Sequence, residues 1–405
     1  MATAIDATAA GALAGVRVLD LSINVLGPVA TQYMGDMGAE VIKVEPPRGD
    51  PMRDTGPGRH PQMSVFYLNL NRNKKSVVLD LKQDAARQAV LRLAGNADVL
   101  VHSMRSQAAE RLGLGYGALS ALYPRLIYAS APGYDPQGPQ RDRPAYDDVI
   151  QGESGLAGMI YMATGKPGYL PTVAADKMCG VFLGSAIGMA LFARERTGRG
   201  QQVQIPMLET MLSFNLVEHL WTGTFGEEGS LGYARALSPH RRPYATRNGY
   251  ICLLAVSDEQ WRRLFASFEQ PELSGDARFA TMEARTRNIN ELYAIVAERI
   301  ALRTTEEWRA RLDAADIPNG SMNRLQDLPA DPYLRQTGFF ERYEHPSEGP
   351  LVRTSIPQRF SETPGSIRLP PPRLGEHTCE VLRAAGYDDT EITRISPGAL
   401  GAKAS

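Results

Sequence analysis

Short apolar runs alternate with helical patterns through the first third of the chain. Runs rich in β-branched residues predict strands at residues 16–21, 41–44, 76–81, 98–101 and 126–130. Apolar positions spaced three and four residues apart predict helices over residues 29–37 and 83–94, each followed by a glycine suited to end a helix. Alternation of this kind predicts an α/β fold with a parallel, doubly wound sheet that is covered on both faces.

Further helices are expected over residues 148–159, 177–196 and 208–221, with a strand at 202–205. The most apolar stretch among them, residues 180–193, is shorter than the ~20 residues that a membrane span needs. The alanine-rich N-terminus lacks the basic region and long apolar core of a secretory signal. We therefore expect a soluble protein without a membrane partner.

The pattern changes after residue 225, where glycine and polar residues become frequent. Two capping boxes, Ser257 with Gln260 and Thr304 with Glu307, predict helix starts in the region that follows. A proline-rich stretch then leads to a last helix over residues 378–385. The predicted organisation is a large domain in residues 1–225, a small α+β domain in residues 226–325, and a linker with a C-terminal return to the large domain in residues 326–405.

Composition narrows the function. The 405 residues include 44 Lys plus Arg and 45 Asp plus Glu, and a net charge of −1 argues against nucleic acid as the main partner. The cysteines Cys179, Cys252 and Cys379 lie far apart, which predicts no disulfide framework and is typical of a reducing cytoplasm. The six histidines show no metal-binding spacing, so we expect no metal.

The first predicted strand and helix enclose a loop that does not suit a dinucleotide. Glu45 follows Asp20 at about the distance of an acidic ribose ligand, but residues 22–28 contain only Gly27 where three glycines are expected. Without the second glycine the backbone cannot closely approach a pyrophosphate, so we expect no NAD. The chain also lacks the GxSxG and Walker motifs of hydrolases and NTPases.

Asp176 lies directly before the helix expected at 177–196. The common role of aspartate in that position is a helix N-cap. A carboxylate there is also held ionised by the helix dipole, can act as a covalent nucleophile, and lies beside N–H groups that could stabilise an oxyanion. The helix is rich in small residues, including Gly180 and Gly184, which allow a backbone or ligand to come close. From the residues alone, both roles stay open.

Basic side chains gather around the predicted strand ends. As a set, they would suit the phosphates of a nucleotide-like molecule bound at the carboxyl edge of the sheet. The set comprises Lys43, Arg48, Arg53, Lys74, Lys75, Arg105 and Arg111.

The chain resembles the class III CoA-transferase family from residue 13 to about residue 395. The segments that show the resemblance are GVRVLDLS, GPVATQYMGDMGAEVIKVEPPRGDP, NRNKKSVVLDLK, ADVLVHSMRSQAAERLGL, RPAYDDVIQGESGL, PTVAADKMCGVFLGSAIGMALFARERTGRGQQVQIPML and LGEHTCEVLRAAG. The resemblance implies a Rossmann-like large domain, a smaller domain, and a chain forming a ring that interlocks with a second copy. It also implies coenzyme A as cosubstrate, with an acyl-CoA and a small carboxylic acid as substrates.

The resemblance assigns the nucleophile to Asp176. It maps the CoA contacts onto Asn24, Val25, Leu26, Arg48, Lys74, Ser103, Met104 and Arg111. Compared with formyl-CoA transferase, Ser103-Met104 replaces Asn-Phe and Pro132 replaces a lysine. Residues 238–244 replace the glycine-rich loop over the nucleophile, which argues against the formyl and oxalate substrate pair.

The expected mechanism passes through an aspartyl mixed anhydride and an aspartyl-CoA thioester on Asp176. Arg241 and Arg242, in a predicted turn of the small domain, suggest a dicarboxylic acid such as succinate. One alternative is an acyl-CoA racemase acting by α-proton abstraction, although residues 144–147 offer no catalytic histidine. The other is a non-catalytic CoA-binding subunit, against which the presence of Asp176 argues.

Overall fold

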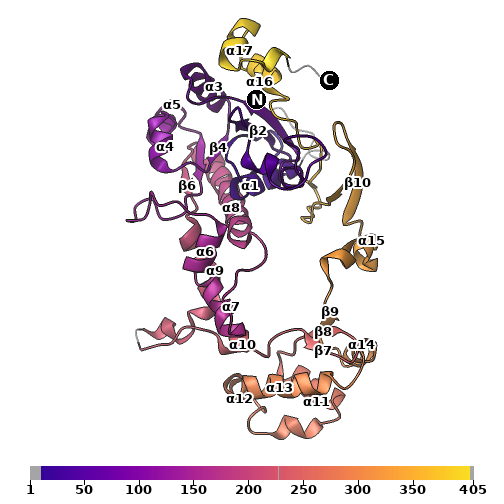
Figure 1. Cartoon of the computed structure of the whole chain (residues 1–405). Coiled ribbons are helices and arrows are strands. Elements are labelled where there is room, and N and C mark those ends of the chain that lie inside the picture. Colours follow the sequence, from indigo (N-terminus) through magenta and orange to yellow (C-terminus); the bar gives the residue numbers. More distant parts are fainter. Residues whose placement is uncertain (1–10, 227, 402–405) are drawn as a thin grey trace. The chain divides into compact units, whose positions relative to one another are not determined.

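The computed structural model describes residues 11–226 and 228–401 and separates into two compact units (Figure 1). The described part of unit 1 comprises residues 11–154, Leu170–Ser213 and residues 338–401. Unit 2 comprises Gly155–Tyr169 and Phe214–Thr337. Unit 2 thus includes a helical stretch before the predicted nucleophile that the sequence analysis placed in the large domain.

Unit 1 is built on a six-stranded sheet with the order β3-β2-β1-β4-β5-β6. The strands are β1 Arg17–Leu21, β2 Glu40–Glu45, β3 Lys74–Val78, β4 Val99–His102, β5 Ile127–Ser130 and β6 Gln202–Gln204. Every neighbouring pair is parallel, which confirms the sheet predicted from the alternating pattern. All four residues of β4 and of β5 are buried, as expected for a parallel sheet with helices on both faces.

Helices cover both faces of this sheet. The helices of unit 1 are α1 Leu26–Asp36, α2 Val65–Leu70, α3 Asp84–Ala94, α4 Ser106–Arg111, α5 Tyr116–Leu122, α6 Asp147–Glu153, α8 Ala174–Thr197, the first half of α9 Met207–His219, α16 Thr378–Ala384 and α17 Asp389–Ile395, with short 3-10 turns at Pro51–Asp54 and Ala399–Gly401. Helices α3, α16 and α17 share one apolar core with β1, β2 and β3. Helices α1 and α8 pack together and against the sheet.

Three of the predicted helices differ most from the structure. Helix α1 begins at Leu26, because Pro28 lies in the first turn, where its missing N–H costs no hydrogen bond. The helix predicted over 148–159 is divided by Gly155, whose φ of 83° favours glycine, into α6 and α7 Leu156–Thr164. Helix α8 begins at Ala174 rather than at Lys177.

Helix α8 is longer than the apolar stretch picked out from the sequence. Its 24 residues meet the length and hydropathy of a membrane span, a weak criterion that core helices also meet. Cys179, Leu183 and Ile187 are fully buried. A β-carbon added to Gly180 would lie 2.7 Å from the carbonyl oxygen of Leu26, so α8 packs against α1 at a distance that only glycine allows.

The C-terminal segment returns to unit 1. The guanidinium of Arg368 donates to the carbonyl of Gly35 in the last turn of α1 and to those of Gly38 and Ala39 just after the helix. The backbone N–H of His377 donates to the carbonyl of Ser76 in β3. Ahead of this segment, β10 Phe340–His345 and β11 Gly349–Thr354 form an antiparallel hairpin in a region expected to be a linker.

Unit 2 has its own core around Trp261, Phe265, Tyr293 and Trp308. Its elements are α7, a 3-10 turn Trp221–Phe225, α10 Ala234–Leu237, β7 Tyr244–Ala245, β8 Tyr250–Leu253, α11 Asp258–Ser267, a 3-10 turn Pro271–Gly275, α12 Met282–Arg287, α13 Ile289–Ile300, α14 Thr305–Ala314, β9 Asn319–Ser321, a 3-10 turn Leu325–Ala330 and α15 Pro332–Gln336. Strands β7, β8 and β9 form a small antiparallel sheet. Both predicted capping boxes are confirmed at the starts of α11 and α14.

Candidate active site

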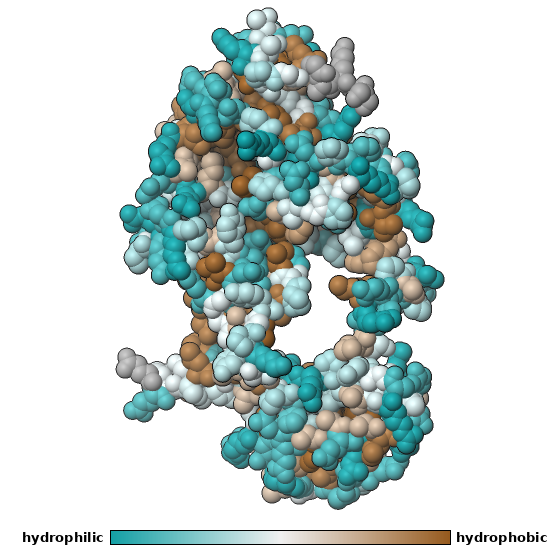
Figure 2. All heavy atoms as spheres, in the orientation of Figure 1, coloured by the Kyte–Doolittle hydropathy of each residue, from teal (hydrophilic) through white to brown (hydrophobic). Residues whose placement is uncertain are grey.

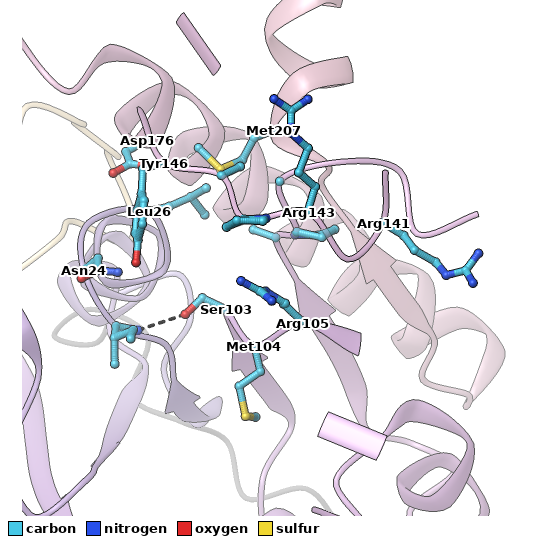
Figure 3. A pocket seen from close by; sticks show the side chains of 16 residues that line it. Asn24, Leu26, Ser103, Met104, Arg105, Arg141, Arg143, Tyr146, Asp176 and Met207 are labelled. Carbon is cyan, nitrogen blue, oxygen red and sulfur yellow. Dashed lines mark hydrogen bonds between the residues drawn. The ribbon is translucent and has the colours of Figure 1, made fainter. Parts of the chain in front are cut away.

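A cavity of about 190 Å³ lies in unit 1, at the carboxyl ends of β1, β4 and β5 (Figure 3). The chain leaves β1 toward β2 on one side, and β4 pairs with β1 on the other. Open α/β sheets bind ligands at this point, where the strand order reverses. The lining residues are Ile23, Asn24, Leu26, Ser103, Met104, Arg105, Ala131, Pro132, Gly133, Arg141, Arg143, Pro144, Ala145, Tyr146, Asp176 and Met207.

The loops after β1 and β4 are fastened to each other at the floor of this cavity. The N–H of Ile23 donates to Ser103 Oγ at 3.2 Å, the dashed line in Figure 3. Asn24 adopts a left-handed conformation with φ of 66°, and its N–H donates to Asp50 Oδ1 at 3.1 Å. The asparagine can hold this conformation because its short polar side chain tolerates it better than most. The cavity wall therefore depends on a carboxylate 26 residues away.

Buried ion pairs support these loops from below. Lys43 Nζ lies 2.8 Å from Asp50 Oδ2 and donates to the carbonyl of Ser22. Lys74 Nζ lies 3.3 Å from Asp20 Oδ2, and all four charged side chains are fully buried. Burial alone raises the pKa of Asp20, but Lys74 and Lys43 reverse this and hold it below its ordinary value. Removing one partner of such a pair would leave an uncompensated buried charge, which is strongly destabilising.

Asp176 is the third residue of α8, and its carboxyl group reaches the cavity. Val173 occupies the N-cap without a side-chain hydrogen bond, so the N-cap role considered for Asp176 is wrong. Burial, and then the neighbouring charge of Asp147, raise the pKa of Asp176 to about 7. This direction is opposite to the one expected from the helix dipole, because burial and a like charge both favour the protonated carboxyl group.

The backbone N–H of Asp176 already has a partner. It donates to Asp147 Oδ1 at 3.0 Å. The N–H of Ala174 donates to the carbonyl of Thr172. Two of the first-turn N–H groups that the sequence analysis considered for oxyanion stabilisation are thus used within the protein.

The cavity is chemically asymmetric. Figure 3 shows Asp176 beside Tyr146 and Leu26 at one side and the guanidinium of Arg105 across the cavity, while the guanidinium of Arg143 points away from it. Arg143 also pairs with Glu153 at 2.8 Å. A carboxyl group with a pKa of about 7, apolar walls and the guanidinium of Arg105 opposite suit a ligand with a reactive carbonyl at one end and an anionic group at the other.

Five of the nine site residues predicted from the sequence line this cavity: Asn24, Leu26, Ser103, Met104 and Asp176. Val25 is buried and packs against Val29 and Leu70. Arg48, in the turn after β2, and Arg111, the last residue of α4, are exposed and lie outside the cavity lining.

Lys74 departs most from its expected place. It begins β3, at the amino edge of the sheet, and its side chain is fully buried. Its Nζ donates to the carbonyl of Pro28 at 3.0 Å and to Asp20, and burial lowers its pKa to about 8. Buried in this way, the side chain has no exposed atoms to offer a cosubstrate.

Four residues near the site were not singled out from the sequence. Arg141, Arg143 and Tyr146 belong to a polar stretch for which no site residue was predicted, and their arrangement around the cavity depends on folding. The arginines in RDRPAYDD were the available signal, because they follow the fifth predicted strand as other basic residues follow the earlier ones. Asp147 was noted only as part of a segment without a histidine.

The chain is similar to known proteins over nearly its whole length. The model of "CoA-transferase family III" matches residues 13–378. Human succinyl-CoA:glutarate CoA-transferase is 31% identical over 389 residues, covering 95% of this chain and 88% of that protein. The (R)-2-hydroxy-4-methylpentanoate CoA-transferase of Clostridioides difficile is 30% identical over 393 residues, covering 95% and 98%.

A solved structure agrees as well. Rv3272 from M. tuberculosis matches with a TM-score of 0.80 and 32% identity over 92% of this chain and 99% of that one. One assignment follows from the family model, which matches most of the chain, from relatives that are transferases by name, and from the shared fold. The chain belongs to CoA-transferase family III.

Proposed function

We propose that this enzyme moves coenzyme A from an acyl-CoA to a carboxylic acid, with Asp176 as the covalent nucleophile. The observation that carries the proposal is the carboxyl group of Asp176 in the cavity, with a pKa of about 7 and the guanidinium of Arg105 opposite. At neutral pH about half of such groups are ionised, and the ionised form is more basic than an ordinary carboxylate. Greater basicity makes it a better nucleophile toward a thioester.

In the first half-reaction, a carboxylate oxygen of Asp176 attacks the thioester carbonyl of the donor. The carbon–sulfur bond breaks, and CoA leaves as a thiolate from a mixed anhydride. The thiolate then attacks the Asp176 carbonyl and expels the donor acid as a carboxylate. The product is an aspartyl-CoA thioester on Asp176.

The second half-reaction reverses these steps with another acid. The acceptor carboxylate attacks the aspartyl thioester, and the thiolate leaves a new mixed anhydride. Attack of the thiolate on the acyl carbonyl releases the new acyl-CoA and restores the Asp176 carboxylate. No proton, electron or water is consumed, so the protein has only to hold the thiolate near and keep water out.

Coenzyme A contacts are assigned to the side of the cavity formed by Asn24, Leu26, Ser103 and Met104. Arg105, which follows Met104, supplies a cation suited to a phosphate of the same ligand. This assignment leaves out Lys74, whose ammonium is buried in an ion pair. Arg48 and Arg111 stay predictions, because both are exposed beyond the cavity lining.

The acids exchanged are proposed to include a dicarboxylic acid such as succinate. The name of the human relative includes succinyl-CoA and glutarate, and Arg143 lines the cavity. Arg241 and Arg242 belong to unit 2, and their part in binding the acid stays a prediction. If Arg242→Ala leaves the KM for succinate unchanged, that part of the proposal fails.

Proton abstraction from an acyl-CoA is the weaker alternative. A racemase site of the kind considered from the sequence uses a histidine with an aspartate. Among the described residues that line the cavity, no histidine is present. The relatives reported above are transferases by name.

The direct test is to trap the intermediate. We expect incubation with succinyl-CoA, followed by borohydride or hydroxylamine and mass mapping, to find the modification on Asp176. Asp176→Ala should lower turnover about a thousandfold or more, because the covalent route is lost. Solvent deuterium entering an acyl-CoA without any modification of Asp176 would instead support the racemase alternative.

A homodimer is proposed as the working state. Large apolar side chains on α8 are exposed: Val181, Phe182, Met189 and Phe192. In Figure 2, apolar areas interrupt the hydrophilic surface in the region that Figure 1 labels α8 and α9. Together with the family resemblance, this face favours coverage by a second copy. Light scattering should give twice the 44.3 kDa chain mass, and Met189→Asp should shift it toward the monomer.

The three cysteines are free thiols, which favours a reducing compartment such as the cytoplasm.

A further inference from the structure

Asp147 is held in a buried hydrogen-bond chain beside the nucleophile. One carboxylate oxygen accepts the backbone N–H of Asp176 at 3.0 Å, and the other accepts Gln151 Nε2 at 2.6 Å. Only 6% of Asp147 and 1% of Gln151 is exposed. These hydrogen bonds therefore anchor the first turn of α8 to α6, in a place that solvent barely reaches.

Gln151 extends the chain to the segment that leads into α8. Its Oε1 accepts the N–H of Leu170 at 3.0 Å, and its Nε2 also donates to the carbonyl of Thr172 at 3.2 Å. Residues 170–176 are thus held along their length by two side chains of α6. Because Val173 supplies no side-chain cap, Asp147 performs from another helix the task of an N-cap.

We propose that Asp147 is the positioning residue for the nucleophile, fixing the first turn of α8 through the N–H of Asp176 and presenting a second carboxylate to it. The proposal rests on the proposed function, in which Asp176 attacks a thioester. Positioning matters there, because a nucleophile displaced by about 1 Å loses much of its rate. The neighbouring charge also keeps the carboxylate basic.

The other charged groups around Asp176 set the background for this effect. The same helix carries Lys177, which donates to Thr172 Oγ1, and Cys179, which bonds the carbonyl of Met207. The elements packed against α8 and the cavity lining contribute Asp148 and Glu153 on α6, Tyr33 and Asp36 on α1, Tyr128 on β5, and Arg105, Arg141, Arg143 and Tyr146. Burial and Asp147 are what raise the pKa of Asp176.

Two substitutions separate charge from geometry. Asp147→Asn keeps an oxygen that can accept the N–H of Asp176 and removes the charge, while its NH2 group can no longer accept from Gln151 Nε2. We expect the acid limb of the kcat profile to move to lower pH by roughly half a unit or more, with the plateau within about threefold of wild type. Asp147→Ala removes both, and kcat should fall about tenfold or more while the KM for acyl-CoA changes less than threefold.

Asp148→Asn is the matched control, because it removes the neighbouring exposed carboxylate of α6. An unmoved acid limb in Asp147→Asn, or an equal shift in Asp148→Asn, overturns the proposal. A rise in KM without loss of kcat in Asp147→Ala does so as well. Thermal melting of each variant shows whether it is folded before it is assayed.

A readout independent of turnover keeps this proposal separate from the proposed function. Infrared difference spectra between each protein and its Asp176→Asn counterpart report the titration of the Asp176 carboxyl directly. If Asp147→Asn lowers the pH at which the Asp176 carboxyl titrates, while the wild-type enzyme shows no CoA transfer, the proposed function fails and the positioning role stands. If transfer is normal and the titration does not move, only the positioning role fails.

Discussion

The raised pKa of Asp176 implies that the nucleophile weakens the fold that carries it. Between pH 4 and 7 the native protein binds more protons at this group than the unfolded chain does, so native stability falls as the pH rises through that window. A pKa raised from 3.8 to about 7 corresponds to about 4 kcal/mol of lost stability at pH 8, and to about 2 kcal/mol at pH 5.5. Asp176→Asn removes this penalty, because the amide cannot ionise.

We therefore expect Asp176→Asn to be inactive and more stable than wild type. Water that reaches the partly buried carboxylate reduces the stability loss at both pH values. We therefore expect the gain in unfolding free energy from Asp176→Asn to grow by at least about 1 kcal/mol between pH 5.5 and 8. Urea unfolding at each pH measures the gain. All three tryptophans lie in unit 2, so circular dichroism and hydrogen exchange of β1 and β4 peptides are the probes for unit 1.

The control is Asp148→Asn, which changes the net charge equally at an exposed position. Equal stability of Asp176→Asn and wild type at both pH values would refute the reasoning, as would a gain that shrinks toward alkaline pH. Mass spectrometry before and after unfolding confirms that the asparagine has not deamidated.

Other substitutions test the support of the cavity. Lys74→Met leaves a buried carboxylate without its ion-pair partner and should cost about 3 kcal/mol of unfolding free energy, whereas Lys75→Met, at a partly exposed pair, should cost at most about 1 kcal/mol. Folded Lys74→Met should keep the wild-type KM for acyl-CoA. A tenfold rise in that KM would show that Lys74 contacts coenzyme A after all. Gly27→Ala should lower activity, because its β-carbon would overlap Ser22 and displace the cavity loop, whereas Gly117→Ala meets no atom within 4 Å and should leave kinetics unchanged.

The sheet could be predicted because its signals are local. Strands β1, β2, β4 and β5 are short and mostly apolar, and Gly38, with φ of 107°, follows the end of α1 as expected. The hairpin β10–β11 escaped prediction because its residues are half exposed and carry no strong apolar run. The turn between its strands, Pro346-Ser347-Glu348 before Gly349, does contain turn-forming residues, so the missing signal lay in the strands.

The site was predictable only in part, for a related reason. Asp176 was found from its helix and from family resemblance, but its pKa depends on Asp147, 29 residues earlier in the chain. Lys74 follows the pattern of a surface cation in the sequence, and only the fold shows that Asp20 lies opposite its ammonium. Partnerships between buried charges are contacts distant in sequence, and no local pattern encodes them.

The hydrogen bonds of Arg368 have a consequence for synthesis of the chain on the ribosome. The carbonyls at the end of α1 receive this guanidinium only after 330 further residues have been made, with most of unit 2 in between. Phe214–Thr337 takes on the order of ten seconds to translate. During that interval the residues that line the cavity exist, but β3 lacks the C-terminal segment that bonds to Ser76. The nascent enzyme therefore presents an open sheet edge, and its vulnerability to aggregation ends only when the last tenth of the chain arrives.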